Sequence, residues 1–145
     1  MRIATQIKIN APIDSVWNKL VDFKNYPKWN LFMTKIEGEQ KEGEILTVNI
    51  APPGGSPAIF TPVLTKYIPN KELRWVGTLG PQWLFRGEHY FQLKDNGDGT
   101  TDFTHGENFT GWLVPLFSCL AGRKTTAGFN LMNSNLKNTV EAKYE

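Results

Sequence analysis

Residues 84–110 read LFRGEHYFQLKDNGDGTTDFTHGENFT, two segments of alternating apolar and polar residues around a turn. The turn is Asn96-Gly97-Asp98-Gly99, which is typical of a β-hairpin connection because Asn and Gly readily adopt positive φ angles. Alternation with a period of two indicates strands that bury one face. We therefore predict an antiparallel hairpin with strands near residues 84–94 and 101–110.

The odd-numbered positions of this hairpin form its apolar face. They are, in chain order, Phe85, Gly87, His89, Phe91, Leu93, Phe103, His105, Glu107 and Phe109. If the turn closes the hairpin, His89 lies roughly opposite His105 or Glu107, within cross-strand reach. The chain's only two histidines and one carboxylate would then meet in an apolar lining.

More strands are predicted on the N-terminal side of the hairpin. Residues 3–9 alternate between Ile or Thr and smaller or polar residues, which indicates an opening strand. Four further strand candidates lie near residues 32–39, 44–51, 58–68 and 72–79. Residues 51–57, APPGGSP, pair poorly and should form a protruding hairpin tip. With the hairpin, the count is seven strands: one opening strand and six in succession.

Helical patterns follow the first strand and close the chain. A short helix is predicted from about residue 12 to residue 21, and a second short turn is expected at Asn25-Tyr26, because the residue before Pro27 disfavours the helical region. After Gly111, apolar residues recur at helical spacing, which predicts a long helix with Pro115 in or before its first turn. Gly122 and Gly128 weaken this helix locally or let it approach the sheet closely. The apolar stripe is Leu113, Leu116, Phe117, Leu120, Phe129, Met132, Leu136 and Val140.

Length and composition fit one globular domain. The chain has 145 residues, of which 40% are hydrophobic, enough to bury a core. Its 16 basic and 14 acidic residues are interspersed, without the basic stripe that phosphate backbones require, so nucleic acid is not an expected partner. No apolar run is long enough to span a bilayer. Because Cys119 is the only cysteine and residues 1–5 lack the apolar core of a signal peptide, we expect a cytoplasmic protein.

Several segments together resemble the START-like (SRPBCC) superfamily, in its bacterial polyketide cyclase/dehydratase-like branch. They are INAPIDSVW at residues 9–17, DFKNYPKWN at 22–30, GEHYF at 87–91, FTHGE at 103–107 and the closing helix. The resemblance implies an α+β helix-grip fold: a seven-stranded antiparallel sheet wrapped around a long C-terminal helix, with two short helices after the first strand. It covers residues 1–145 as one domain and implies a cavity for lipids, polyketides, sterols or other apolar ligands.

The residues expected to line this cavity come from three strands and the long helix. Trp75 alternates with Leu73 and should face inward. Gly77 and Gly87 either leave space among large rings or mark a bulge. The predicted lining is Leu73, Trp75, Gly77, Phe85, Gly87, Phe91, Phe103 and Phe109, opposite Phe129 and Met132. Trp83 and Trp112 flank turns, and either line an entrance or are partly buried beside a loop.

His89, His105 and Glu107 are the candidate catalytic residues. An imidazole beside a carboxylate can perform general acid/base chemistry, because each changes the proton affinity of the other in a dry site. The same three side chains can instead form a satisfied hydrogen-bond cluster that only orients the strands. Two histidines and a carboxylate can also bind a metal, but no distinctive ligand motif is present, so no metal and no cofactor are expected.

Three classes of function remain open from the sequence. The first is binding or transport of an apolar or amphipathic small molecule, such as a lipid or a polyketide-like compound. The second is a polyketide cyclase or dehydratase in which His89, His105 and Glu107 move protons. The third is a structural or regulatory protein whose cavity is filled by side chains and whose outer surface binds another protein. The ligand and the oligomeric state do not follow from the sequence.

Overall fold

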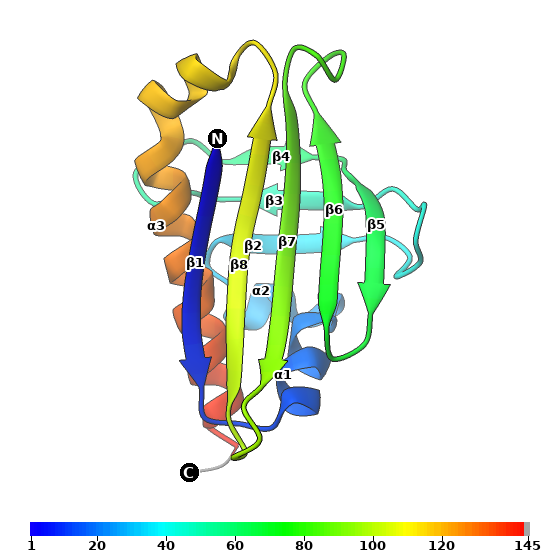
Figure 1. The fold of residues 1–145 in the computed structure, drawn as a ribbon, viewed down its shortest axis with the longest axis vertical. Helices are drawn as coiled ribbons and strands as arrows, with labels where there is room; N and C mark the ends of the chain where they lie inside the picture. The colour runs from blue at the N-terminus through cyan, green and yellow to red at the C-terminus, as the bar shows by residue number, and fades with distance from the viewer. Residues whose placement is uncertain (144–145) are drawn as a thin grey trace.

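The predicted hairpin lies in the middle of a five-stranded antiparallel sheet (Figure 1). In this computed structural model, which describes residues 1–143, β7 (Arg86–Asp95) pairs with β8 (Thr101–Thr110) across the turn. β8 also pairs with β1 (Arg2–Ile9), while β7 pairs with β6 (Glu72–Thr78) and β6 with β5 (Val63–Ile68). The order β1-β8-β7-β6-β5 therefore brings the first strand beside the last.

The chain forms eight strands in two sheets rather than seven in one. The predicted strand at 58–68 is divided into β4 (Ala58–Phe60) and β5, with Pro62 between them. Proline has no amide hydrogen to donate to a ladder, so the chain leaves one sheet and enters the other at this point. β4 completes a three-stranded sheet with β2 (Met33–Glu37) and β3 (Thr47–Ile50), in the order β2-β3-β4. Figure 1 shows this sheet crossing behind the larger one.

Two short helical segments follow β1 as predicted, but the expected effect of Pro27 was wrong. α1 (Ile13–Leu20) buries Val16, Trp17 and Leu20. The 3₁₀ turn η1 (Phe23–Asn25) leads into α2 (Tyr26–Trp29), which begins one residue before Pro27, and Tyr26 has helical φ and ψ angles of −51° and −41°. The first turn of a helix tolerates proline because its amide hydrogens have no partner within the helix.

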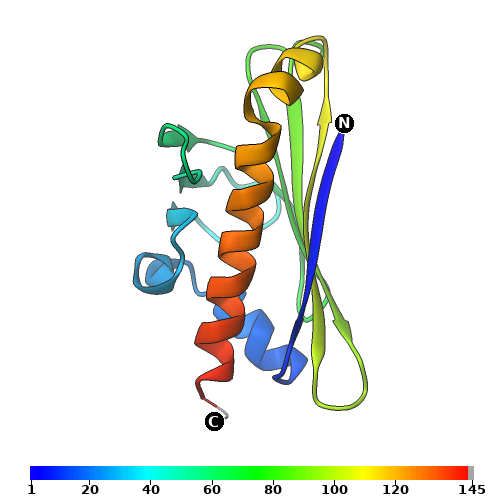
Figure 2. The same cartoon turned by 90° about the vertical axis from the view of Figure 1, so that its left-hand side faces the viewer.

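The long helix α3 (Val114–Glu141) runs along the side of the molecule between the two sheets (Figure 2). Pro115 lies in its first turn, as predicted. Phe129, Met132, Leu136 and Val140 are buried, so the second half of the helix packs into the main core. The result is the helix-grip arrangement, an antiparallel sheet wrapped around a C-terminal helix.

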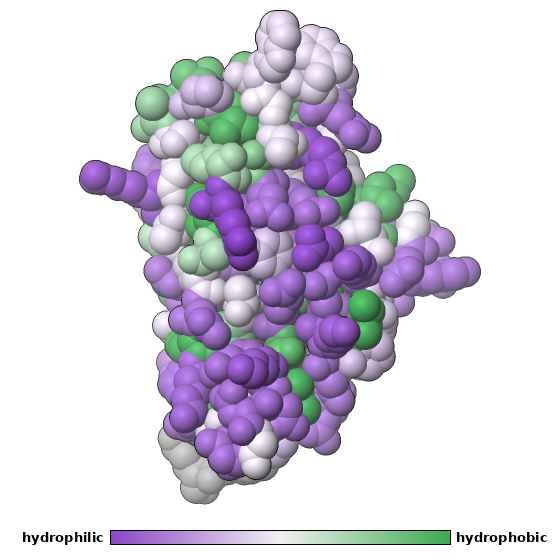
Figure 3. Space-filling view, viewed as in Figure 1, coloured by the Kyte–Doolittle hydropathy of each residue, from purple (hydrophilic) through white to green (hydrophobic). Residues whose placement is uncertain are grey.

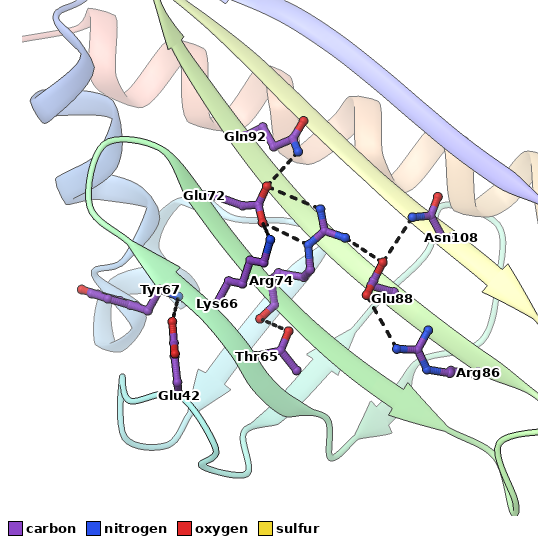
Figure 4. Close-up of polar contacts among 10 residues, drawn as sticks. All are labelled: Glu42, Thr65, Lys66, Tyr67, Glu72, Arg74, Arg86, Glu88, Gln92 and Asn108. Carbon is purple, nitrogen blue, oxygen red and sulfur yellow. Dashed lines mark hydrogen bonds and ion pairs between the residues drawn. The ribbon is translucent and has the colours of Figure 1, made fainter.

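The outer face of the five-stranded sheet is polar and closely paired (Figure 3). Arg74 contacts Glu72 at 3.1 Å and Glu88 at 2.6 Å (Figure 4). Its guanidinium also lies 5.0 Å from the ring centre of Tyr90. Burial alone would raise the pKa of Glu72, but hydrogen bonds from Gln92 and Arg74 outweigh it and lower that pKa. On β6, β7 and β8 the even-numbered residues therefore form the outer face of the sheet, and the odd-numbered residues face the helix.

Gly128 fixes how closely α3 approaches the segment before β2. A β-carbon at this position would lie 2.3 Å from the ring of Phe32, which is itself buried. At Gly122 a β-carbon would meet nothing within 4 Å. The first glycine therefore serves close packing, whereas the second has no neighbour that requires it.

Replacing these two glycines by alanine should change stability in opposite directions. Gly128→Ala forces the helix away from Phe32 and should lower the free energy of unfolding by about 1–3 kcal/mol, as overpacking does. Gly122→Ala should raise it by up to about 1 kcal/mol through helix propensity alone. Urea unfolding of both variants measures the difference. Equal effects at the two positions would contradict the proposed contact.

Candidate functional site

A cavity of about 480 Å³ lies between the two sheets and the first half of α3. Of the residues predicted to line it, six do so: Trp75, Gly77, Phe85, Gly87, Phe109 and Phe129. The candidate catalytic residues His89 and Glu107 also reach it. The cavity is therefore apolar over most of its wall, with one carboxylate and one imidazole at its inner surface.

Four predicted lining residues lie elsewhere. Leu73, Phe91, Phe103 and Met132 are fully buried in the packed core and do not reach the cavity. They have the predicted inward direction, but α1 packs against this end of the sheet and its Val16, Trp17 and Leu20 belong to the same core. The inner face of the sheet is consequently filled at one end and hollow at the other.

Much of the cavity wall was not predicted. The three-stranded sheet and its connections supply Phe32, Val48, Ile50, Phe60 and Pro62, and the start of α3 supplies Leu113, Leu116, Phe117 and Leu120. The helical stripe was visible in the sequence as an apolar pattern. The sequence did not show that the first half of this stripe lines a cavity, because periodicity identifies a buried face without identifying what covers it.

His89, His105 and Glu107 meet as predicted from the hairpin register. His89 is paired directly with Glu107 across the β7–β8 ladder, and the His89 Nδ1 to Glu107 Oε1 distance is 3.1 Å. The two histidines are joined through their Nε2 atoms at 2.7 Å. The three side chains thus form a continuous chain of contacts that begins at the cavity and ends in the core.

Two residues that the sequence analysis missed extend this chain. Asn133 of α3 lies with its Oδ1 3.0 Å from His105 Nδ1, and its Nδ2 donates to Thr5 Oγ1 at 2.8 Å. The Thr5 hydroxyl donates to the backbone carbonyl of His105 at 2.9 Å. The available signal was a polar residue on an apolar stripe, since Asn133 lies among Phe129, Met132 and Leu136 of the helix.

These contacts determine where the protons lie. Because Asn133 donates through Nδ2 to Thr5, it presents its oxygen to His105, and His105 Nδ1 must carry a proton. A neutral His105 then accepts at Nε2 from the Nε2 hydrogen of His89. The remaining contact, between His89 Nδ1 and Glu107 Oε1, joins an imidazole nitrogen to a carboxylate, two groups that can pass a proton between them. This contact is the one nearest the cavity.

The surroundings of His105 keep it neutral. Burial holds the pKa of His105 well below its ordinary value of 6.5, the nearby His89 lowers that pKa further, and the hydrogen bond with Asn133 offsets part of the decrease. Its ring stacks on Phe129, with the ring centres 4.1 Å apart. His89 lies similarly against Trp75, with ring centres 5.3 Å apart. Hydrogen bonds thus hold each imidazole at its ring nitrogens, and a stacked aromatic ring holds it against one flat face.

Gly87 makes room for the Glu107 carboxylate. A β-carbon at Gly87 would lie 2.3 Å from Glu107 Oε2. The ladders on both sides of Gly87 run without interruption through Gly77 and Phe109, so neither glycine marks a bulge. Of the two interpretations of these glycines, the structure supports space among large side chains. Oε1 of Glu107 contacts His89, and the second carboxylate oxygen lies over the glycine at the cavity wall.

The histidine pair is arranged for hydrogen bonding rather than for a shared metal. Zinc binds imidazole nitrogens at about 2.0–2.1 Å in tetrahedral geometry, which places two such nitrogens farther apart than the 2.7 Å observed here. Within residues 1–143, no group of three or more His, Cys, Asp or Glu side chains is placed to hold a metal ion. The absence of a metal stays a prediction, which elemental analysis of the purified protein would test.

An antiparallel sheet that grips a C-terminal helix around an apolar cavity defines the START-like class of proteins. This chain belongs to the family described as "Polyketide cyclase / dehydrase and lipid transport", which it matches over residues 1–141. No functionally curated protein shows significant similarity to it. Within the described residues, no helix combines the length and apolar character needed to cross a bilayer.

Solved structures share the fold at low sequence identity. The ZhuI aromatase/cyclase from Streptomyces sp. R1128 has a TM-score of 0.75 and 13% identity, over 100% of this chain and 96% of that one. A START superfamily protein from Mycobacterium smegmatis has a TM-score of 0.73 and 17% identity, over 98% of both chains. Norcoclaurine synthase from Thalictrum flavum has a TM-score of 0.75 and 15% identity, over 100% and 96%. At these identities the likeness concerns the fold alone.

The depressed pKa of His105 predicts a specific loss of stability in acid. Below about pH 6.5 the unfolded chain protonates His105 and the folded chain does not, so the unfolded state binds more protons and is favoured as pH falls. The free energy of unfolding should therefore decrease by up to about 1.4 kcal/mol per pH unit between about pH 6.5 and pH 5. His105→Asn, whose amide can still donate to Asn133, should flatten this dependence.

Urea unfolding of both proteins at several pH values measures the effect. The lowered pKa values of Glu72 and Glu141 affect stability at more acidic pH, so they do not mask it. Parallel pH profiles for the two proteins would show that His105 titrates equally in the folded and unfolded chains.

Proposed function

We propose that this protein binds an apolar or amphipathic small molecule in the cavity between its two sheets. The cavity of about 480 Å³ carries the proposal, because ligand sites typically measure about 300–1,000 Å³ and are lined mainly by hydrophobic and aromatic side chains. The same space argues against the third class of function, in which side chains fill the interior.

The distribution of polar groups supports a ligand with one polar end. Glu107 and His89 lie on one part of the wall, while Trp75, Phe85 and Phe109 supply rings around them. A hydroxyl or carbonyl group placed here can bond to the carboxylate or to the proton that it shares with His89. Apolar surface removed from water would supply most of the affinity, and the polar pair would orient the ligand.

Filling the cavity from Gly77 should abolish binding without unfolding the protein. A β-carbon at Gly77 would meet Pro62 at 3.7 Å, an ordinary contact, so the rest of a larger side chain would extend into the cavity. Gly77→Leu should weaken binding of N-phenylnaphthylamine at least about tenfold, equivalent to about 1.4 kcal/mol. Probe fluorescence measures the affinity, and native mass spectrometry tests whether the purified protein carries a ligand.

The matched control is Gly122→Leu, which adds the same side chain at a glycine outside the cavity lining. It should bind the probe as the unmodified protein does. If Gly77→Leu also binds normally, the probe occupies another place and the cavity is not the site.

A second candidate function is acid/base catalysis on the bound molecule, of the cyclase or dehydratase type. The specific observation that favours it is the 3.1 Å contact between His89 Nδ1 and Glu107 Oε1 at the cavity wall. Cyclisation of a polyketone needs one group to remove a proton from carbon and another to protonate an oxygen, and a positioned pair can do both. The likeness to an aromatase/cyclase and to norcoclaurine synthase supports the fold's suitability for such reactions.

Binding and catalysis should respond differently to substitutions in the hydrogen-bonded series of His105, His89 and Glu107. Glu107→Gln and His105→Ala should lower any turnover of polyketide-like substrates about a hundredfold or more, which is the typical contribution of general acid/base groups. Probe affinity should change much less, because apolar contacts dominate it. The measurements are product formation, probe binding and far-UV circular dichroism. If folded variants lose binding as severely as turnover, the pair is chiefly a ligand anchor.

A further inference from the structure

The mouth of the cavity is surrounded by exposed apolar side chains. Several residues that line the cavity are also open to solvent, which marks where it meets the surface: Phe60, Leu79, Leu113, Leu116 and Leu120. Leu120 is 69% exposed although it is a large apolar residue. In Figure 3, hydrophobic side chains gather at the upper left, over the start of α3, whereas the lower half is mostly hydrophilic.

Two tryptophans extend this apolar rim. Trp112 is 80% exposed and Trp83 is 61% exposed, and their rings pack on each other with centres 5.6 Å apart. A backbone hydrogen bond from Trp112 to Trp83 joins the β6–β7 loop to the connection before α3. Neither ring lines the cavity. The pair therefore does not belong to the ligand site, and no part of the described chain covers it.

The charges around the mouth have one sign. Residues 45–71, 73–87 and 108–140 contain no Asp or Glu, and they supply all of the cavity lining except Phe32, His89 and Glu107. Arg123 and Lys124 are exposed on α3, about one helical turn after Leu120 at the mouth. The Lys124 side chain extends toward the tip between β3 and β4, where a β-carbon on Gly55 would lie 3.5 Å from it.

We propose that this rim, defined by Leu79, Trp83, Trp112, Leu116 and Leu120 with Arg123 and Lys124, docks on an anionic lipid surface. Tryptophan is favoured at membrane interfaces because its ring is apolar and its N–H is polar. Leucines beside basic residues are typical of segments that bind in the plane of such an interface. Docking in this orientation turns the mouth of the cavity toward the lipid, so an apolar ligand can pass between them without crossing water.

A second copy of the chain is a poorer occupant of this surface. In a two-fold contact the same patch meets itself, so the positive charges of Arg123 and Lys124 would lie against a patch that carries the same charges. The acid-free segments around the mouth offer no carboxylate to neutralise them. An anionic lipid surface supplies that negative charge together with an apolar layer for the rings.

The test is binding of the full chain to vesicles of phosphatidylcholine, with and without phosphatidylserine, by sedimentation and tryptophan emission. Binding should be at least about tenfold stronger to the anionic vesicles, and added salt should weaken it. The double variants Trp83→Ser with Trp112→Ser, and Arg123→Glu with Lys124→Glu, should each reduce it at least about tenfold.

The matched control is Lys24→Glu with Lys28→Glu, the same change of charge on exposed residues of η1 and α2. It should leave vesicle binding close to that of the unmodified protein. Loss of binding in the control equal to that of the rim variants would mean that net charge alone matters, which overturns the proposal. Absence of vesicle binding by the unmodified protein overturns it too, as does a dimer that Trp112→Ser dissociates.

This inference and the proposed function fail in different experiments. Probe binding is measured without vesicles, and the Trp83 and Trp112 variants should retain it because neither residue lines the cavity. Vesicle binding without probe binding would support the docking surface and refute the ligand site. Probe binding without vesicle binding would do the reverse.

Discussion

The register of β7 against β8 is the constraint on which the site depends. It places His89 opposite Glu107 and Phe91 opposite His105, so that both imidazoles and the carboxylate share the inner face. A slip of β7 by one residue would turn His89 outward, away from Glu107 and His105, and bring Arg86 and Glu88 toward the helix. The outer contacts of Arg74 with Glu88 and of Gln92 with Glu72 join β6 to β7 and resist a slip of β7. The polar outer face therefore helps to position the inner one.

The inner face of the sheet has two environments because α1 packs together with α3 against only one end of it. Leu73, Phe91 and Phe103 pack with the residues of α1, whereas Trp75, Phe85 and Phe109 face open space. His89 and Glu107 lie at the boundary between them, and His105 lies just inside the core. The packed core fixes the geometry of these three hydrogen-bonded side chains, and the cavity leaves His89 and Glu107 accessible.

Local patterns were enough to predict the strands, the long helix and the meeting of His89, His105 and Glu107, because hairpin register and face alternation are set within about 27 residues of chain. They could not predict that the chain passes from one sheet to the other at Pro62, because residues 58–68 had the pattern of one continuous strand. They also could not separate Leu73 from Trp75, which have the same parity. That difference depends on where α1 packs, a contact between segments more than 50 residues apart in the chain.

Asn133 shows why the polar chain can specify both structure and chemistry. Its amide oxygen accepts from His105 and its amide nitrogen donates to Thr5, so one side chain of α3 fixes the tautomer of a histidine on β8 through a contact with β1. Because both ring nitrogens of His105 and of His89 have partners, the protons on the two imidazoles cannot rearrange independently. The only position with a choice is the proton between His89 and Glu107, next to the cavity. A ligand that bonds to Glu107 would act at that position alone, while Asn133 keeps the tautomer of His105 unchanged.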